Sequence, residues 1–237
     1  MLANKLALSL PTIGKVGAIT PPPPPWDPSD ESSLLAWYKN KVGVAVNASN
    51  EVGEWSDSSG NGNLMVASGD ATESPTYNST TGELSFNAAR SQHLQLDTNL
   101  QLEIPAEFTI GFKMNATGTN NTILGDNTSS NEYFKITSAT NLRIKNNTGQ
   151  GNIATDTGNL DECDIVLIRD SSGNITMYRD GELQQGNTDL SGDILIDAIG
   201  IREPTINSFN GTISEIQIYT ETDQALTTNV IDYLSNI

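Results

Sequence analysis

Short runs in which apolar and polar residues alternate recur along the chain from Leu34 onward. The most regular run covers residues 107–114, where every second side chain is apolar: Phe108, Ile110, Phe112 and Met114. Further runs occupy residues 34–38, 64–66, 84–86, 94–96, 133–136, 142–144, 165–168 and 175–178, with Gly, Asn, Asp or Ser in the segments between them. Runs this short and this closely spaced predict an all-β sandwich or barrel instead of parallel βαβ units.

Two turn signals connect neighbouring runs around residue 175. Residues 170–173 read Asp-Ser-Ser-Gly and predict a hairpin loop. The pair Asp180-Gly181 is a strong signal for a two-residue type I′ turn, because both positions of that turn need a positive φ. Together the two turns predict a three-stranded antiparallel meander.

A last alternating run closes the series of strands. Its alternation breaks, because Ile216 and Ile218 lie on one face of an extended strand whereas Ile213 lies on the other. A β-bulge near Ser214 and Glu215 would return the three isoleucines to a single buried face. The sequence therefore predicts an irregular closing strand.

After that strand, the spacing between apolar residues changes from two to about four. Leu226, Val230 and Leu234 recur at helical spacing, which predicts a short amphipathic helix. We expect this helix to pack on the end of the sandwich.

Residues 1–33 differ from the remainder of the chain. An apolar start is followed by five consecutive prolines, Pro21 to Pro25, which favour a polyproline II rod of about 3 Å per residue. We expect an extended N-terminal anchoring arm with a stiff spacer, and a disordered leader is the alternative that remains open. Trp26 is expected to pack where the arm meets the body, or on a partner. The side chains expected to bind a partner are Leu2, Leu6, Leu8, Leu10, Ile13, Val16, Ile19 and Trp26.

Composition narrows the classes of partner. The chain of 237 residues carries 29 acidic and 12 basic side chains, a formal net charge of −17, which would repel nucleic-acid phosphates and anionic lipid. We therefore expect neither nucleic acid nor a membrane as a partner. Hydrophobic residues make up 36% of the chain, enough for the core of one domain over residues 34–237. Neither a signal peptide nor a membrane span is evident.

Several segments occur in the order found in one fold family. They are residues 55–62, 84–87, 91–94, 108–112, 168–181, 199–202, 209–219 and 225–234. In this order they resemble the laminin G-like, concanavalin A-like lectin/glucanase jelly-roll family. The resemblance implies a two-sheet antiparallel jelly-roll β-sandwich with a short C-terminal helix. That family consists mostly of binding and adhesion modules, often for carbohydrate and sometimes with calcium, and also contains glycoside hydrolases, so the fold alone names no function.

Catalytic residues are not expected. Glycoside hydrolysis needs two carboxyls across the scissile bond, and hydrolases of the resembled family commonly place them on one strand as Glu-x-Asp-x-Glu. The nearest match is Glu162-Cys163-Asp164, where apolar residues follow and no second Glu arrives. The single histidine, His93, stands in an ordinary strand context instead of a Ser-His-Asp triad. We expect a non-enzymatic protein, with Cys163 as a buried strand thiol.

Calcium is the cofactor for which the sequence offers candidate ligands. Asp57 and Asn61 lie in a turn rich in oxygen ligands, and Glu215 or Asp126 could complete such a site. In the alternative that we prefer, Asp57 forms an Asx turn and accepts backbone N–H groups, while Glu215 supports the bulge. The expectation is therefore no cofactor.

The start of the chain also resembles, over a short stretch, the leaders of small phage virion proteins that carry jelly-roll domains. We therefore expect a structural protein of a phage virion, either a capsid decoration protein or a tail-associated protein. Its arm would bind the major capsid or tail protein by strand addition or groove packing. A homo-oligomer is expected, with a trimer as one arrangement.

The alternative function is a carbohydrate-binding or adhesion module, extracellular or at a cell surface, that contacts a host-surface glycan. It predicts exposed aromatic side chains or a calcium-bearing loop cluster at one end of the sandwich. Trp37 and Trp55 are not expected to serve there, because their apolar, strand-like surroundings place them in the core. A glycoside hydrolase is the third hypothesis, and it predicts two facing carboxyls in a cleft.

Overall fold

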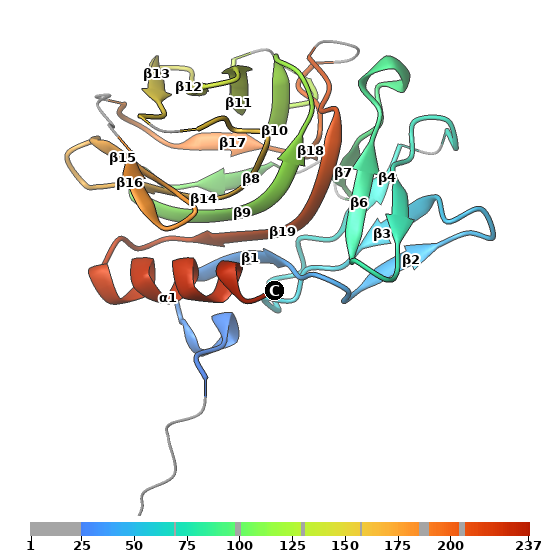
Figure 1. The fold of residues 1–237 in the computed structure, drawn as a ribbon, viewed down its shortest axis with the longest axis horizontal. Helices are drawn as coiled ribbons and strands as arrows, with labels where there is room; N and C mark the ends of the chain where they lie inside the picture. The colour runs from blue at the N-terminus through green and yellow to red at the C-terminus, as the bar shows by residue number, and fades with distance from the viewer. Residues whose placement is uncertain are drawn as a thin grey trace, which may run out of the picture.

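The computed structural model describes residues 25–68, 70–97, 101–128, 131–156, 158–184, 190–203 and 207–237. Within these residues, strands form two large antiparallel sheets that pack face to face, and one α-helix lies outside them (Figure 1). The predicted fold, an all-β two-sheet jelly roll with a short C-terminal helix, is confirmed. The seven predicted arm residues at the start of the chain lie outside the described residues: Leu2, Leu6, Leu8, Leu10, Ile13, Val16 and Ile19.

The first sheet, sheet A, has eight strands in the described part of the chain. Their spatial order is β16 (Glu182–Gln184), β15 (Ile175–Arg179), β14 (Glu162–Arg169), β9 (Phe108–Ala116), β19 (Gly211–Tyr219), β6 (Glu83–Phe86) and β5 (Thr76–Asn78). The eighth strand, β1 (Leu34–Tyr38), pairs with the second half of β19, beyond the part that pairs with β6. The closing strand therefore holds the first strand of the body in the sheet.

The second sheet, sheet B, has nine strands among the described residues. Their order is β13 (Gly149–Ala154), β12 (Asn141–Asn146), β11 (Tyr133–Ser138), β10 (Asn121–Gly125), β18 (Ala198–Ile199), β7 (Leu94–Leu96), β4 (Met65–Ala67), β3 (Val52–Trp55) and β2 (Val44–Val46). The remaining elements are the strand pair β17 (Ile194–Ile196) and β8 (Leu102–Ile104), and the 3₁₀ helices η1 (Pro28–Asp30) and η2 (Ala88–Arg90).

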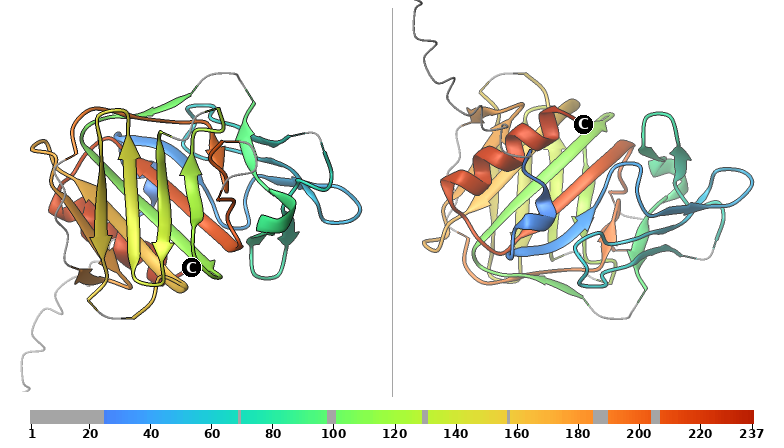
Figure 2. Two further views of the ribbon diagram at one scale, coloured as in Figure 1. Left: turned by 90° about the horizontal axis from the view of Figure 1, so that it is seen from above. Right: turned by 90° about the horizontal axis from the view of Figure 1, so that it is seen from below.

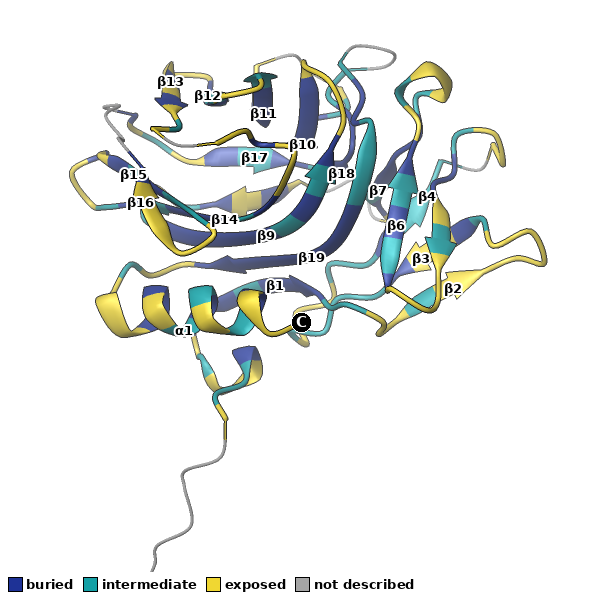
Figure 3. Cartoon of the chain, in the orientation of Figure 1, coloured by how far each residue is buried: buried dark blue, intermediate teal, exposed yellow. Residues whose placement is uncertain are grey.

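The core lies between the two sheets and follows from the alternation of their strands. Most of β9 is buried (Figure 3). Its apolar residues Phe108, Ile110 and Phe112 are fully buried. The ring of Phe108 meets that of Phe134 in β11 edge to face, with centroids 5.8 Å apart. The run predicted from residues 107–114 is thus a central strand whose apolar face fills the sandwich.

The predicted bulge in the closing strand is confirmed. The register between β19 and β9 shifts between Ile213 and Glu215, so Ser214 is the extra residue. Ile213 and Ile216 are then both buried in the core in spite of their odd separation. Beyond the bulge, Glu215 lies on the outer side of sheet A, where it faces β1.

The predicted meander is also present. Strand β14 pairs with β15, and β15 pairs with β16. Asp180 and Gly181 connect β15 to β16 with φ angles of 49° and 78°, as a type I′ turn requires. Gly173, with φ of 86°, supplies the left-handed position in the loop between β14 and β15.

The predicted helix is α1 (Gln224–Ser235). It begins at Asp223, whose carboxylate accepts the N–H of Leu226 at 2.7 Å. Its apolar stripe is buried, as the spacing predicts, and consists of Leu226, Val230 and Leu234. In the described residues, no helix is long and apolar enough to cross a bilayer.

The expected position of this helix was wrong. α1 lies along the outer face of sheet A, across β9 and β14, and not on the end of the sandwich (Figure 2, right). The reason is the small residue Gly111 of β9. A Cβ atom at that position would come within 2.9 Å of Cγ1 of Val230, so only glycine leaves room for the helix at this distance. Val166 of β14 completes the contact.

Candidate functional site

The candidate site is the outward side of β10 to β13 and of the segment that follows β18. Every second residue of β11 and β12 enters the core, namely Phe134, Ile136, Leu142 and Ile144. The residues between them point outward. We call this surface the open face, and it comprises Thr122, Tyr133, Lys135, Arg143, Lys145, Asn152 and Arg202. Seen from above, its strands are not covered by the helix, which lies on the far side (Figure 2, left).

Strand pairing brings the cations of the open face together. Lys135 is paired with Arg143, and Tyr133 with Lys145, so their side chains are cross-strand neighbours. The guanidinium carbon of Arg202 lies 4.5 Å from the centroid of the Tyr133 ring, and Nζ of Lys135 lies 6.0 Å from it. Four of the 12 basic residues of the chain thus gather on one part of an acidic protein.

Neutral amides hold two of these cations. Nε of Arg143 donates to Oδ1 of Asn152 at 2.8 Å, and Nζ of Lys145 donates to Oδ1 of Asn131 at 3.0 Å. Among the described residues, no carboxylate lies within ion-pair distance of Lys135, Arg143 or Lys145. The amides therefore fix the positions of these two cations without neutralising their charge.

Lys135 is the deepest cation of the site. Only 6% of the residue is exposed, and burial, followed by the charges of Arg202 and Arg143, lowers its pKa to about 8. Thr122 of β10 is paired with Lys135 on the other side, and its hydroxyl is buried without a hydrogen-bond partner in the described structure. A mostly buried lysine residue and an unsatisfied buried hydroxyl thus lie next to each other.

Glu215 occupies the opposite side of the molecule, where the bulge places it. It is fully buried and accepts hydrogen bonds from Nε1 of Trp37, from the backbone N–H of Asn40 and, at 3.0 Å, from Nε2 of Gln217. Burial nevertheless raises the pKa of this carboxyl to about 7, against the effect of these donors. The contacts join β19 to β1, as the bulge-support interpretation predicts.

The structure assigns structural roles to the candidate calcium ligands. The carboxylate of Asp57 accepts the backbone N–H groups of Trp37 and Ser59, each at 2.9 Å, which is the predicted Asx turn. The side-chain amide of Asn61 donates to two carbonyls of β1. Asp126 accepts from Thr128 in a second turn of this kind. In the part of the chain that the structure describes, no three Asp, Glu, His or Cys residues are placed to hold a metal ion.

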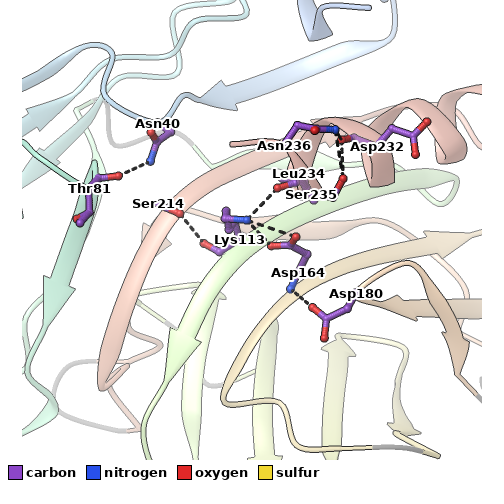
Figure 4. Close-up of polar contacts among 10 residues, drawn as sticks. All are labelled: Asn40, Thr81, Lys113, Asp164, Asp180, Ser214, Asp232, Leu234, Ser235 and Asn236. Carbon is purple, nitrogen blue, oxygen red and sulfur yellow. Dashed lines mark hydrogen bonds and ion pairs between the residues drawn. The ribbon is translucent and has the colours of Figure 1, made fainter.

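A small pocket of about 210 Å³ lies where β9, β14 and β19 meet, and it contains the carboxyls of the hydrolase hypothesis. Nζ of Lys113 lies 3.1 Å from Asp164 and 2.9 Å from the carbonyl oxygen of Leu234 near the end of α1 (Figure 4). Asp180 accepts the backbone N–H of Asp164 at 2.9 Å. Glu162 lies at the same pocket and is exposed. Asp164 thus joins β14 to Lys113 of β9, which also holds the end of α1, and Asp180 joins the β15–β16 turn to β14.

The remaining reactive side chains are buried. Cys163 belongs to the core cluster from β14, and burial raises the pKa of its thiol to about 12, so the prediction of a buried strand thiol is confirmed. His93 lies just before β7, with Nδ1 2.8 Å from the carbonyl oxygen of Ser91. No nucleophile accompanies it in the contacts of the described residues.

Comparison with known proteins places this fold in a family. No curated protein sequence matches the chain. A family model described as the concanavalin A-like lectin/glucanases superfamily matches residues 87–231, which is more than half of the chain. The chain belongs to this superfamily.

Solved structures share the superfamily fold at low sequence identity. Domain 4 of AbnA, a GH43 extracellular arabinanase from Geobacillus stearothermophilus solved in complex with arabinotriose, is 17% identical, with a TM-score of 0.61 over 86% of this chain and 98% of that domain. The binding domain of Paraclostridial Mosquitocidal Protein 1 is 16% identical (TM-score 0.55, 89% and 53% of the two chains). The botulinum neurotoxin serotype G binding domain is 15% identical (0.56, 85% and 50%). The chain therefore spans about half of each toxin domain.

This member of the concanavalin A-like superfamily offers no exposed aromatic side chain among its described residues. Trp37 and Trp55 are buried, as predicted. Trp26 is half-buried: its ring packs edge to face on Tyr233 of α1 at 6.1 Å, and its Nε1 donates to Glu31 at 2.8 Å. Of the two positions expected for Trp26, the structure shows packing on the body, and its binding to a partner stays a prediction. In the described ranges, the exposed large apolar residues are Val42, Val46, Leu183 and Ile237.

The cations of the open face are the candidate residues that the sequence pattern did not single out. A signal was available, because Arg143 and Lys145 occupy the polar positions of a run whose apolar positions are Leu142 and Ile144. Lys135 occupies a polar position in the run before it. Only the strand register shows that the three cations are neighbours.

Proposed function

We propose that the protein is a non-enzymatic, carbohydrate-binding module. Its N-terminal arm attaches it to a larger assembly. The resemblance of the arm to leaders of phage virion proteins favours a phage virion as that assembly. The jelly-roll body binds a glycan on the open face, and residues 1–24 bind a structural protein of the particle. The displayed body would thereby attach the particle to a glycosylated surface.

The observation that carries this proposal is that the start of the body and the open face lie on opposite sides of the sandwich. Residues 25–33, which include η1, lie beside α1 on the outer side of sheet A (Figure 1). Asp27 in this segment is 3.8 Å from Lys39. The open face lies on the outer side of sheet B, across the core. A body held in this orientation directs its open face away from its attachment point.

Two further facts support a binding role over catalysis. The domain of AbnA that has the similar fold was solved in complex with arabinotriose, and almost all of that domain is matched. The carboxyls of Asp164 and Asp180 are engaged by Lys113, by a backbone N–H and by Arg179 in the described structure, so they already hold elements of the fold together. A hydrolase would need two carboxyls that face a substrate across a cleft.

A glycan array tests the binding function. The full chain, labelled and applied with and without EDTA, is expected to retain a defined set of glycans in both conditions. If no glycan is retained in either condition, the carbohydrate-binding function is wrong. Incubation of retained glycans with the chain should leave them intact, and release of a product would establish an enzyme instead.

Deletion of residues 1–24 tests the tether. The shortened chain should keep the circular dichroism spectrum of the full chain and the same glycan set, but should no longer co-sediment with particles assembled in its presence. Unchanged co-sedimentation would show that the arm is not the tether, and would leave the glycan result to be judged separately.

A further inference from the structure

We propose that the open face recognises an anionic sugar residue, one that carries a carboxylate or a sulfate group. This inference rests on the proposed carbohydrate-binding function and names its ligand class. The starting observation is the grouping of Lys135, Arg143, Lys145 and Arg202 on a chain whose formal net charge is −17. Such a local reversal of sign marks the surface where an anion would be attracted.

Arg143 is arranged to receive the anion directly. Its Nε is bound to Asn152 at 2.8 Å, which fixes the plane of the guanidinium group. An arginine has five N–H donors, and the other N–H groups of Arg143 donate to no described residue. They form the planar fork that binds a carboxylate or a sulfate through two parallel hydrogen bonds. Lys145 stands two residues further along the same side of β12 and adds a second positive charge.

Lys135 provides an independent reason to expect an anion. Partial burial of a cation that has no carboxylate partner costs free energy, because part of its water is removed and no opposite charge replaces it. Lys135 is nine-tenths buried, lies between Arg143 and Thr122 in the register, and has no ion-pair partner among the described residues. An anion bound to Arg143 would supply that charge. The buried hydroxyl of Thr122, which lacks a partner there, is a further polar group beside Lys135.

The size of the cationic region favours a sugar over an extended polyanion. The four cations belong to two neighbouring strands and one adjoining segment, whereas the remainder of the protein is strongly acidic. Electrostatic attraction is screened beyond about 8–10 Å at physiological salt. A sugar with one anionic group needs only the area of these cations, while a nucleic acid would extend over the acidic surroundings. A neutral sugar would lack a stacking surface, since Tyr133 is buried beneath Arg202.

The test uses the full chain, with the substitutions Arg143→Gln and Lys145→Gln on the open face. Their matched controls are Arg90→Gln and Lys41→Gln, which remove the same charges from exposed positions elsewhere. Binding is measured by calorimetry to sialylated, uronic-acid-containing, sulfated and neutral oligosaccharides, with single-stranded DNA as a polyanion. Unchanged thermal unfolding of all four variants establishes that each is folded.

The expected result is binding of one or more anionic oligosaccharides, weakened at least tenfold by either open-face substitution and less than twofold by either control. The carboxylated and sulfated arms then identify which anion is recognised. Binding of neutral oligosaccharides that both open-face variants retain would overturn this inference and leave the carbohydrate-binding function intact. DNA bound as tightly as any sugar would also overturn it. If the folded wild-type chain binds no sugar, both the inference and the proposed function fail.

Discussion

The two outer surfaces of the sandwich differ in what covers them: a helix packs on sheet A, whereas the outward cations of sheet B lie at the surface. The outer face of sheet A is covered, because α1 packs on β9 and β14 and buries Val166 against its own Val230. Glu215 is buried on the same side by its contacts with Trp37 and Asn40. The open face of sheet B keeps its outward cations Arg143 and Lys145 at the surface, held by neutral amides. The carboxyl of Glu215 on the sheet A side is therefore buried in protein contacts. The cations Arg143 and Lys145 of the open face are accessible to a ligand.

Under the proposed function, this difference assigns stability to the outer face of sheet A and ligand recognition to the open face. Changes beneath the helix should alter the free energy of unfolding, because they remove buried contacts. Changes on the open face should alter binding and leave folding nearly unchanged. The following predictions test that separation, beginning with the largest expected change.

Val230→Asp should have the largest effect. Val230 is fully buried between α1 and β9, so the new carboxylate would be buried without a partner or would release the helix. We expect the free energy of unfolding to fall by about 4 kcal/mol, as measured by urea denaturation. Thr228→Asp, on the exposed side of the same helix, is the control and should change stability by less than about 0.5 kcal/mol. Equal losses in both variants would show that α1 does not seal sheet A.

Glu215→Gln should change how stability depends on pH. The pKa of Glu215 is raised to about 7 in the folded protein, from an ordinary value of 4.5, so the folded state holds the proton more tightly. The resulting stabilisation is fully present below pH 4.5 and is lost as the pH rises through 7. Because one unit corresponds to about 1.4 kcal/mol, the wild type should lose about 3 kcal/mol between pH 4.5 and pH 8 through this group.

The variant lacks that titration, so its deficit relative to the wild type should be larger at pH 5 than at pH 8. Urea denaturation at both values measures it. Glu162→Gln, which changes an exposed carboxyl on β14, is the control and should show no such difference. A deficit of Glu215→Gln that is the same at both pH values would contradict the raised pKa.

Trp26→Ala should have a moderate effect, because Trp26 is only half-buried. The substitution removes the ring contact with Tyr233 and the hydrogen bond to Glu31. We expect a loss of about 1–2 kcal/mol in the free energy of unfolding. Leu183→Ala, at a side chain that is 60% exposed, should have almost no effect and serves as the control. If Trp26→Ala also leaves the free energy of unfolding unchanged, the contact of residues 25–33 with the helix does not stabilise the protein.

Arg143→Gln should have the smallest effect on stability, below about 0.5 kcal/mol. It should instead raise the pKa of Lys135 above its value of about 8, because Arg143 is one of the two charges that lower it. Arg90→Gln should leave that pKa unchanged. Nuclear magnetic resonance titration of the Lys135 side chain measures the shift, and an unchanged pKa in Arg143→Gln would show that the two cations are not neighbours.

The fold could be predicted largely because alternation reports which side chains are buried. The bulge at Ser214, the turn at Asp180-Gly181 and the helix after Asp223 all appear in the sequence as local signals. Strands with weak alternation were missed, and β13 is an example, because Gly149 and Gly151 within it look like turn residues. β13 is extended because it pairs with β12, and not because its own residues prefer a strand conformation.

The candidate site was harder to predict than the fold. Arg143 and Lys135 are eight positions apart in sequence, and their contact depends on the register of β11 with β12. Arg202 reaches the same surface from a segment after β18. The position of α1 depended in a similar way on Gly111, a residue whose importance appears only when the helix lies on it. Such non-local neighbours leave no periodic pattern in the sequence.

The attachment of β1 to the closing strand has a mechanical consequence. Under the proposed tether, tension that enters at residue 25 reaches the contact between Trp26 and Tyr233 first and β1 next. β1 is hydrogen-bonded along β19, and Glu215 adds bonds to Trp37 and Asn40. The pull on a tethered module would therefore reach the last strand of the body and its helix before the rest of the sandwich.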